Sequence, residues 1–333
     1  MLELAKSNPA APPSLTDLRK VISVTELIGN TPLLEIRKIT GGLSPQIRIF
    51  AKLEGFNPGG SVKDRPALRM IQAALQNGEL RPGQVIIDST SGNTGIAIAM
   101  IGRALGYPVR IVMPENVSQE RKGIIAAFGA DIVYSDPFEG TDGAIHLCRQ
   151  IVEDAPEKYF KPDQYNNPMN SLAHYETTGP EIYRQTNQSI THFIAGIGTG
   201  GTVMGTGRFL KEQDERIRVI AVEPDDALHG LEGLKHMESS IVPGIFHEQE
   251  LDGKMSVSTE DAYDMVHRLS QEEGILVGQS AGAAMHASLE LARRLSHGLL
   301  VTVFCDFGAR YLTTNLWTGW HKELAVGDSN FSI

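Results

Sequence analysis

Short apolar strands alternate with helical patterns along this chain, and that alternation restricts its fold more than any other feature. In the first half, the sequence predicts strands at 85–88, 109–113 and 132–134, with helices at 94–105 and 118–128 between them. Strands that are joined through helices make a parallel sheet covered by helices on both faces. We therefore expect an α/β protein.

The same order continues in the second half of the chain. The expected elements are a helix at 170–184, strands at 192–195, 219–222 and 299–305, and helices at 203–213, 260–273 and 281–295. An earlier strand is expected at 47–53. The chain has 333 residues, which is enough for two domains or one large unit.

A lysine stands where an amphipathic helix begins. Gly59 and Gly60 precede Lys63 and would let the backbone pass close to a ligand. Ser61 or Asp64 can cap the helix, which would fix Lys63 at its N-terminus. Fixed lysines form Schiff bases with carbonyl compounds or with pyridoxal phosphate (PLP). The alternative is a solvated lysine that pairs with Asp64.

Three loops between a strand and a helix are candidates for ligand binding. The loop Thr90–Gly95 (TSGNTG) offers hydroxyls and free N–H groups to an anion such as a carboxylate, although an ordinary N-cap turn is the alternative. The loop Gly196–Thr202 (GIGTGGT) can cradle a phosphate at a helix N-terminus. In the loop Gly278–Gly282, Ser280 is either a site residue or a helix cap.

The second of these loops has a rival interpretation. Gly196, Gly198 and Gly201 satisfy G-x-G-x-x-G, and Glu223 ends the next strand, where a ribose-binding acid would stand in a dinucleotide fold. This pattern would make the protein an NAD-dependent dehydrogenase. It explains neither Lys63 nor the loop that follows Ser89.

Composition excludes several classes of partner. A net charge of −10 without a basic run argues against nucleic acid, and no apolar run is long enough to span a bilayer. Cys148 and Cys305 are predicted to be core thiols without a disulfide framework, which suggests a cytoplasmic protein. No metal site is predicted. Residues 1–22 are expected to form a flexible arm without a signal peptide, and 323–333 a mobile tail.

Taken together, these motifs resemble the fold-type II PLP enzymes (tryptophan synthase β-like), and specifically the cysteine synthases, over Val24 to Thr314. The motifs are Gly29–Leu33, Lys52–Glu54 with Asn57-Pro58, Ser61–Arg65, Thr90–Gly95, Asp163–Pro168, His174–Ile182, Gly198–Thr202, Ala221–Pro224 and Ser280–Ala283. The segments Ser118–Arg121 and Val242–Phe246 are more similar to the B-type isoform.

The resemblance implies a role for each motif. Lys63 would carry PLP as an internal aldimine, Asn93 would bond the 3-oxygen of the ring, and Ser280 would bond the pyridine nitrogen as a neutral partner. The phosphate would lie on Gly198, Thr199, Gly200, Gly201 and Thr202, and the substrate carboxylate on Thr90, Ser91, Asn93 and Thr94 beside Gln164. An O-activated serine would lose its leaving group, and sulfide would add to the resulting aminoacrylate to give L-cysteine.

Two departures from the family pattern leave the exact reaction open. Gln279-Ser280-Ala281 replaces a common Ile-Ser-Ser and resembles cystathionine β-synthase, although the arm has no cysteine for haem. The segment Leu231–Met237 resembles that of O-phosphoserine users, with Lys235 where they carry arginine. The donor is therefore O-acetylserine or O-phosphoserine. A binding protein that kept the scaffold without catalysis is a further alternative.

The resemblance also implies an organisation and partners. We expect two three-layer αβα domains: a smaller one at 57–168 with the carboxylate loop, and a larger one at 23–56 and 169–322 that binds the PLP phosphate. A homodimer is expected, with serine acetyltransferase as a candidate partner. Because that partner's peptide ends in isoleucine, Ile333 could dock on the Thr90–Thr94 amides, although a tail with a coincidental ending is the favoured interpretation.

Overall fold

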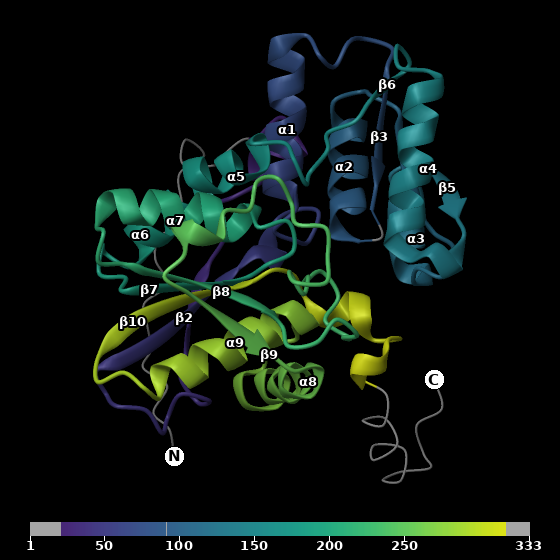
Figure 1. Ribbon diagram of the computed structural model, residues 1–333. Coiled ribbons are helices and arrows are strands. Elements are labelled where there is room, and N and C mark those ends of the chain that lie inside the picture. The colour runs from purple at the N-terminus through teal and green to yellow at the C-terminus, as the bar shows by residue number, and fades with distance from the viewer. Residues whose placement is uncertain (1–20, 91, 318–333) are drawn as a thin grey trace, which may run out of the picture.

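The computed structural model describes residues 21–90 and 92–317, which fold around two sheets (Figure 1). The larger sheet has the order β1-β2-β10-β7-β8-β9, and the smaller has the order β5-β4-β3-β6. Their strands are β1 (Leu33–Ile36), β2 (Ile47–Leu53), β3 (Val85–Ser89), β4 (Val109–Pro114), β5 (Asp131–Ser135), β6 (Tyr159–Phe160), β7 (His192–Gly196), β8 (Arg218–Pro224), β9 (Gly253–Val257) and β10 (Gly298–Phe304). Among these strands only the β1–β2 pair is antiparallel, which confirms the α/β class with mostly parallel sheets.

Nine α-helices lie in the described part of the chain. They are α1 (Asp64–Asn77), α2 (Asn93–Ala104), α3 (Gln119–Ala127), α4 (Gly140–Asp154), α5 (Met169–Ala173), α6 (Gly179–Gln185), α7 (Gly201–Gln213), α8 (Thr259–Arg268) and α9 (Gln279–Ala292). Short 3-10 helices occur at Val24–Leu27, Glu54–Phe56, Pro137–Glu139, Glu248–Glu250, Gly308–Tyr311 and Asn315–Trp317. No helix within these described ranges is long and apolar enough to cross a membrane.

The larger sheet is covered on both faces because successive residues of a strand point to opposite sides. In β10, Leu300 belongs to the core that includes Met285 of α9 and Met265 of α8. Its neighbour Val301 belongs to the core that includes Met204 of α7. Figure 1 shows α6 and α7 on one face and α8 and α9 on the other. Each large side chain buried in this way contributes about 1.5–3 kcal/mol.

The smaller sheet repeats this construction. Ile86 of β3 packs in the core that contains Ile71 of α1 and Ile96 of α2, whereas Ile87 packs with Cys148 of α4. Cys148 is buried and free, as predicted. Both sheets therefore bury two apolar layers, and the carboxyl ends of their parallel strands carry the loops that the sequence singled out.

The expected helix at 170–184 is interrupted. Helices α5 and α6 are joined by a π-helical turn at His174–Thr178, and a second π turn at Leu269–Glu273 follows α8. A π turn closes its hydrogen bonds over five residues instead of four, so it is wider than an α turn and often occurs at functional sites.

The predicted arm at 1–22 lies almost entirely outside the described residues, and the tail at 323–333 and Ser91 lie wholly outside them. Within the described ranges, no cluster of three or more His, Cys, Asp or Glu side chains could hold a metal ion.

Candidate active site

The loop that carries Lys63 is joined to the end of strand β10. Lys63 is the N-cap residue of α1 and is partly buried. The N–H of Val62 donates to the carbonyl of Cys305 at 2.8 Å, and Ser61 forms a bridge with Asp306. Lys63 is therefore held at the carboxyl edge of the larger sheet and is not a loose surface side chain.

The predicted helix cap by Ser61 or Asp64 is wrong. The Asp64 carboxylate accepts the N–H of Gly59 at 2.5 Å, and the Ser61 hydroxyl accepts the N–H of Lys63 at 3.3 Å, so neither caps the N–H groups inside α1. Burial raises the pKa of Asp64 to about 7. The carboxylate shapes the glycine turn, because a Cβ on Gly59 would lie 2.3 Å from Asp64 Oδ1.

The predicted carboxylate loop follows β3 and leads into α2. Thr90 and Thr94 are buried, and the hydroxyl of Thr94 donates to Gln164 Oε1 at 2.8 Å. Asn93 is the first residue of α2, and its side chain contacts Asp306 and Arg310. The structure thus brings Thr94 and Gln164 together from sequence positions 70 residues apart.

The predicted phosphate loop follows β7 and leads into α7. Gly200 has φ +85°, and a Cβ on Gly198 would lie 2.3 Å from the Gly233 carbonyl, so both positions require glycine. Thr199 Oγ1 accepts from Gly201 N–H at 3.4 Å. This backbone, packed at the N-terminus of a 13-residue helix, fits a phosphate group.

Asn170 joins the two predicted loops. Its Nδ2 donates to the Gln164 carbonyl at 2.7 Å and to Thr199 Oγ1 at 3.0 Å. Gly201 has no room for a side chain, because a Cβ there would lie 2.0 Å from Asn170 Oδ1. The carboxylate loop and the phosphate loop therefore belong to one connected site.

Ser280 lies in the first turn of α9 but does not cap it, since the N-terminus of that helix has no side-chain cap bond. Its loop lies against the end of β10, since a Cβ on Gly278 would lie 2.4 Å from Asp306 Oδ1. The hydroxyl of Ser280 acts on the nearby Cys305 thiol, and burial raises the pKa of that thiol to about 11. Both groups are therefore uncharged near neutral pH. The charge of Lys63 acts on Cys305 as well, so the lysine, Ser280 and the end of β10 share one region.

Lys235 lies on the ring of Tyr165, with its Nζ 5.1 Å from the ring centroid. Its backbone N–H donates to the Ile197 carbonyl at 2.8 Å, which fixes it beside the phosphate loop. Burial lowers the pKa of Lys235. Among the described residues, no carboxylate forms an ion pair with it.

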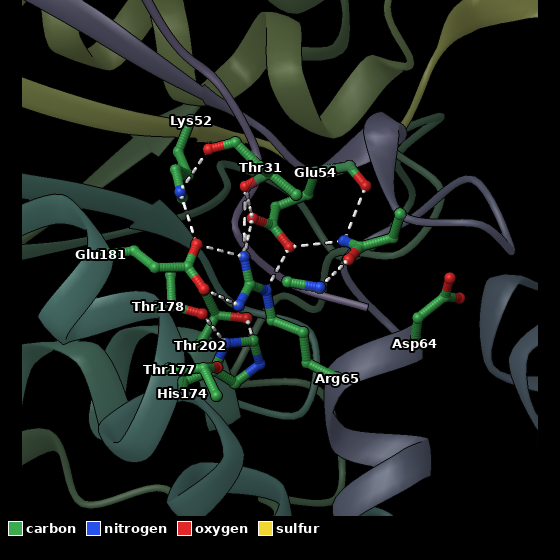
Figure 2. A network of polar contacts seen from close by, with 12 residues as sticks. Thr31, Lys52, Glu54, Asp64, Arg65, His174, Thr177, Thr178, Glu181 and Thr202 are labelled. Carbon is green, nitrogen blue, oxygen red and sulfur yellow. Dashed lines mark hydrogen bonds and ion pairs between the residues drawn. The ribbon is translucent and has the colours of Figure 1, made fainter. Parts of the chain in front are cut away.

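A buried ionic network lies behind the start of α1 (Figure 2). Arg65 donates from Nε to Glu54 at 2.6 Å and from Nη1 to Glu181 at 2.7 Å, and Lys52 pairs with Glu181 at 2.6 Å. Burial would raise the pKa of Glu181, but the hydrogen bonds and charge of Arg65 outweigh it and lower the pKa to about 2. Because Arg65 is two residues from Lys63, this network anchors the lysine's helix.

His174 connects the π turn to the phosphate loop (Figure 2). Its Nδ1 lies 2.9 Å from Thr178 Oγ1, and its Nε2 lies 3.3 Å from Thr202 Oγ1. Burial, assisted by the charge of Arg65, lowers the pKa of His174 to about 3. A neutral imidazole therefore orients the hydroxyl of a residue predicted to bind phosphate.

The dinucleotide interpretation finds no support in the geometry. Glu223 accepts from the N–H of Met237 at 3.1 Å and pairs with Lys254 at 3.0 Å, so its carboxylate is already engaged on both oxygens. It holds the segment that carries Lys235 and is not presented to a ribose.

The chain is similar to known enzymes along most of its length. A family described as pyridoxal-phosphate dependent enzymes matches residues 24–306. The chain belongs to this family. It is 56% identical over 301 residues to a cysteine synthase of Aquifex aeolicus, covering 89% of this chain and 92% of the relative. It is 40% identical over 305 residues to cysteine synthase B of Salmonella typhimurium, covering 92% of this chain and 99% of the relative.

A solved structure extends the match to the fold. The crystal structure of a cysteine synthase (OASS) from Entamoeba histolytica has a TM-score of 0.88 at 35% identity and covers 94% of each chain. The protein is a PLP-dependent cysteine synthase of fold-type II, as the motifs predicted, and it forms cysteine from an O-activated serine and sulfide.

Four residues that contribute to this site of the cysteine synthase were not predicted as site residues. They are Asn170, which joins two loops, His174, which contacts Thr202, and Asp306 and Arg310, which contact Asn93. The position of Asp306 directly after an apolar strand was the one available signal, because ligands in open α/β sheets bind at carboxyl ends of strands.

Proposed function

We propose that the cofactor site consists of the residues that the sequence singled out. Lys63 holds PLP covalently, Gly198 to Thr202 bind its phosphate, Asn93 bonds the ring oxygen and Ser280 bonds the ring nitrogen. The observation that carries this assignment is their convergence: the Lys63 loop is joined to the end of β10, beside Ser280, and Asn93 reaches the same strand end through Asp306. When bound, PLP withdraws electrons from the substrate's α-carbon.

The protein's own groups then account for binding and proton transfer. Thr90, Ser91, Asn93 and Thr94 bind the substrate carboxylate at the start of α2, with Gln164 beside them. The amine of Lys63 would accept the α-proton as general base. The neutral Ser280, next to a thiol that stays protonated, does not hold the ring nitrogen in its charged form, which favours loss of the β-substituent over racemisation.

We further propose that the donors include O-phosphoserine as well as O-acetylserine, and that Lys235 binds the phosphate leaving group. Its ammonium contacts the face of Tyr165, next to Gln164, and pairs with no carboxylate of the described residues. The charge of Asp142 acts on Lys235 without forming an ion pair. A partly buried cation without an ion pair gains from an anionic ligand, and each charge-assisted hydrogen bond contributes about 1.5–3 kcal/mol.

The test measures kcat/KM for O-phosphoserine and for O-acetylserine in wild type, Lys235→Ala and Lys122→Ala. Lys235→Ala should lower kcat/KM for O-phosphoserine by about tenfold or more, and for O-acetylserine by much less. Lys122→Ala is the matched control, because the Nζ of Lys122 also lies 5.1 Å from the centroid of a tyrosine ring, but the residue belongs to α3 and to none of the predicted site loops. Equal losses with both donors in the Lys235 variant would remove the proposal for O-phosphoserine without affecting cysteine synthesis from O-acetylserine.

The organisation predicted from the family completes the proposal. Residues 57–168 would form the smaller domain, and 23–56 with 169–322 the larger one. The protein would be a homodimer that binds serine acetyltransferase. Sedimentation equilibrium of the purified protein tests the first association, and a monomer at micromolar concentration would contradict it. The cofactor spectrum, recorded with and without that acetyltransferase's C-terminal peptide, tests the second, and an unchanged spectrum would contradict it.

A further inference from the structure

The segment that follows β10 is attached to the site on two sides. On one side, the carbonyl of Cys305 accepts from Val62, and Asp306 is paired with Ser61. On the other side, Phe307 is paired with Val277, which precedes the helix of Ser280. Residues 306–311 are therefore positioned by the loop of Lys63 and by the loop of Ser280.

Asp306 uses one carboxylate oxygen for two hydrogen bonds. Its Oδ2 accepts from Asn93 Nδ2 at 2.5 Å and from the Tyr311 hydroxyl at 2.5 Å. The residue is 1% exposed, and its Oδ1 has no hydrogen-bond partner among the described residues. A Cβ on Gly278 would lie 2.4 Å from this Oδ1, so the neighbouring glycine leaves space for the carboxylate. A buried carboxylate with an unsatisfied oxygen is costly, which calls for a function.

Arg310 contacts the opposite end of the same amide. Its Nη1 donates to Asn93 Oδ1, and its Nη2 donates to the Gly59 carbonyl in the turn before Lys63. The carbonyl end of Asn93 therefore faces a cation, and its amino end faces a carboxylate. Rotating the amide by 180° would turn its oxygen toward the Asp306 carboxylate and its NH2 group toward the Arg310 guanidinium. Only the observed orientation is therefore compatible with these neighbours.

This arrangement leaves Asn93 with one free donor. An asparagine amide has two N–H groups, and Asp306 takes one of them. The remaining N–H has a fixed direction, because the amide plane is held at both ends. A ligand oxygen at this place would meet a donor that needs no reorientation before binding, which is the form of preorganisation that favours binding and catalysis.

We propose that Asp306 and Arg310 are positioning residues that fix the Asn93 amide, so that its single free N–H is presented to the ring oxygen of the bound cofactor. The inference rests on the proposed role of Asn93 and goes beyond it, since it names what sets the orientation of that residue. Tyr311 donates to the same Oδ2 of Asp306 as Asn93 does, but forms no hydrogen bond with the Asn93 amide itself.

The experiment follows the visible absorption of the PLP-loaded enzyme, which responds to hydrogen bonding at the ring oxygen, together with the Kd for PLP after its removal. We expect Asn93→Ala, Asp306→Ala and Arg310→Gln to shift the spectrum in the same direction and to weaken PLP binding by about tenfold. Because Asp306 acts through Asn93, the double variant Asn93→Ala/Asp306→Ala should have the spectrum of the Asn93 single variant.

Tyr311→Phe is the matched control. It removes the other hydrogen bond to the same oxygen of Asp306, and it should lower thermal stability while leaving the cofactor spectrum unchanged. Arg310 is partly exposed, so its variant remains informative even if Asp306→Ala fails to fold. A shifted spectrum for Asn93→Ala, with unshifted spectra for the Asp306 and Arg310 variants, would overturn the inference. An unshifted spectrum for Asn93→Ala would instead contradict the proposed role of Asn93, and with it the basis of the inference.

Discussion

Replacing His174 by glutamine should remove one defined pH dependence from the stability of this enzyme. His174 is 1% exposed, and burial together with Arg65 lowers its pKa to about 3, whereas an unfolded chain has a histidine pKa of about 6.5. Between these values the unfolded chain binds one proton more than the folded protein. Stability from this group is therefore fully present above pH 6.5 and is lost as the pH falls toward 3.

The magnitude follows from the two pKa values. One proton difference changes the free energy of unfolding by about 1.4 kcal/mol per pH unit, so wild type should lose roughly 2.7 kcal/mol through His174 between pH 7.5 and pH 4.5. Asp64 and Asp88, each with a pKa raised to about 7, have the opposite effect, since protonation favours the folded state. Both acids remain in the variant, so their contributions cancel in the comparison.

The assay is urea unfolding of wild type and His174→Gln at both pH values, with PLP in excess. The glutamine should cost a fixed amount for the lost contacts with Thr178 and Thr202, and its disadvantage should shrink by roughly 2–3 kcal/mol at pH 4.5. His297→Gln is the control, because that side chain is exposed and its replacement should have the same effect at both pH values. An equal disadvantage for the His174 variant at both pH values would refute the argument that the imidazole is buried in its neutral form.

Three further outcomes are expected. Lys63→Ala should abolish cysteine formation, measured as product released, while circular dichroism stays that of wild type; turnover above a trace would remove its catalytic assignment. Ser280→Asp should protonate the ring nitrogen and raise racemisation relative to cysteine formation by chiral product analysis, and an unchanged ratio would contradict the role of a neutral partner. Arg65→Met should lower the free energy of unfolding by about 3–5 kcal/mol, because it leaves Glu54 charged and buried without its partner. The control Arg216→Met, at an exposed ion pair, should change it by less than about 1 kcal/mol. Similar losses in both variants would mean that the buried network does not anchor the helix.

The sequence was most informative where backbone constraints are local. Glycines at 198 and 200 were identified as part of a phosphate cradle because glycines expose backbone N–H groups before a helix. The structure adds why each position needs glycine, in a carbonyl contact for Gly198 and a positive φ for Gly200. The strands and helices that the sequence named were placed within a few residues, because burial on both faces imposes a visible pattern, whereas strands β6 and β9 were not predicted. The π turn at 174–178 leaves no such pattern, since its residues look like any other helix.

The partners of individual side chains could not be predicted. Aspartate is a residue type that often caps helices, yet the carboxylate of Asp64 accepts the N–H of Gly59. The shape of the glycine turn determines this partner. The pairing of Asn93 with Asp306 joins positions 213 residues apart, and no local periodicity encodes it. Sequence patterns therefore identified the segments that form the site, whereas the partners of individual side chains depend on how the two sheets are placed.

The π turn between α5 and α6 also determines how the side chains before it are rotated relative to those after it. Each residue of a helix turns the direction of the side chains by about 100° and advances the axis by about 1.5 Å. Asn170, before the turn, faces the phosphate loop, and Glu181, after it, faces Arg65 and Lys52. Deleting a single residue from 174–178 would leave a longer regular helix but would rotate one of these two side chains out of alignment with its partners. The number of residues in this segment therefore fixes the direction of Asn170 relative to Glu181. Changing that number should disturb the site even where the remaining residues are kept.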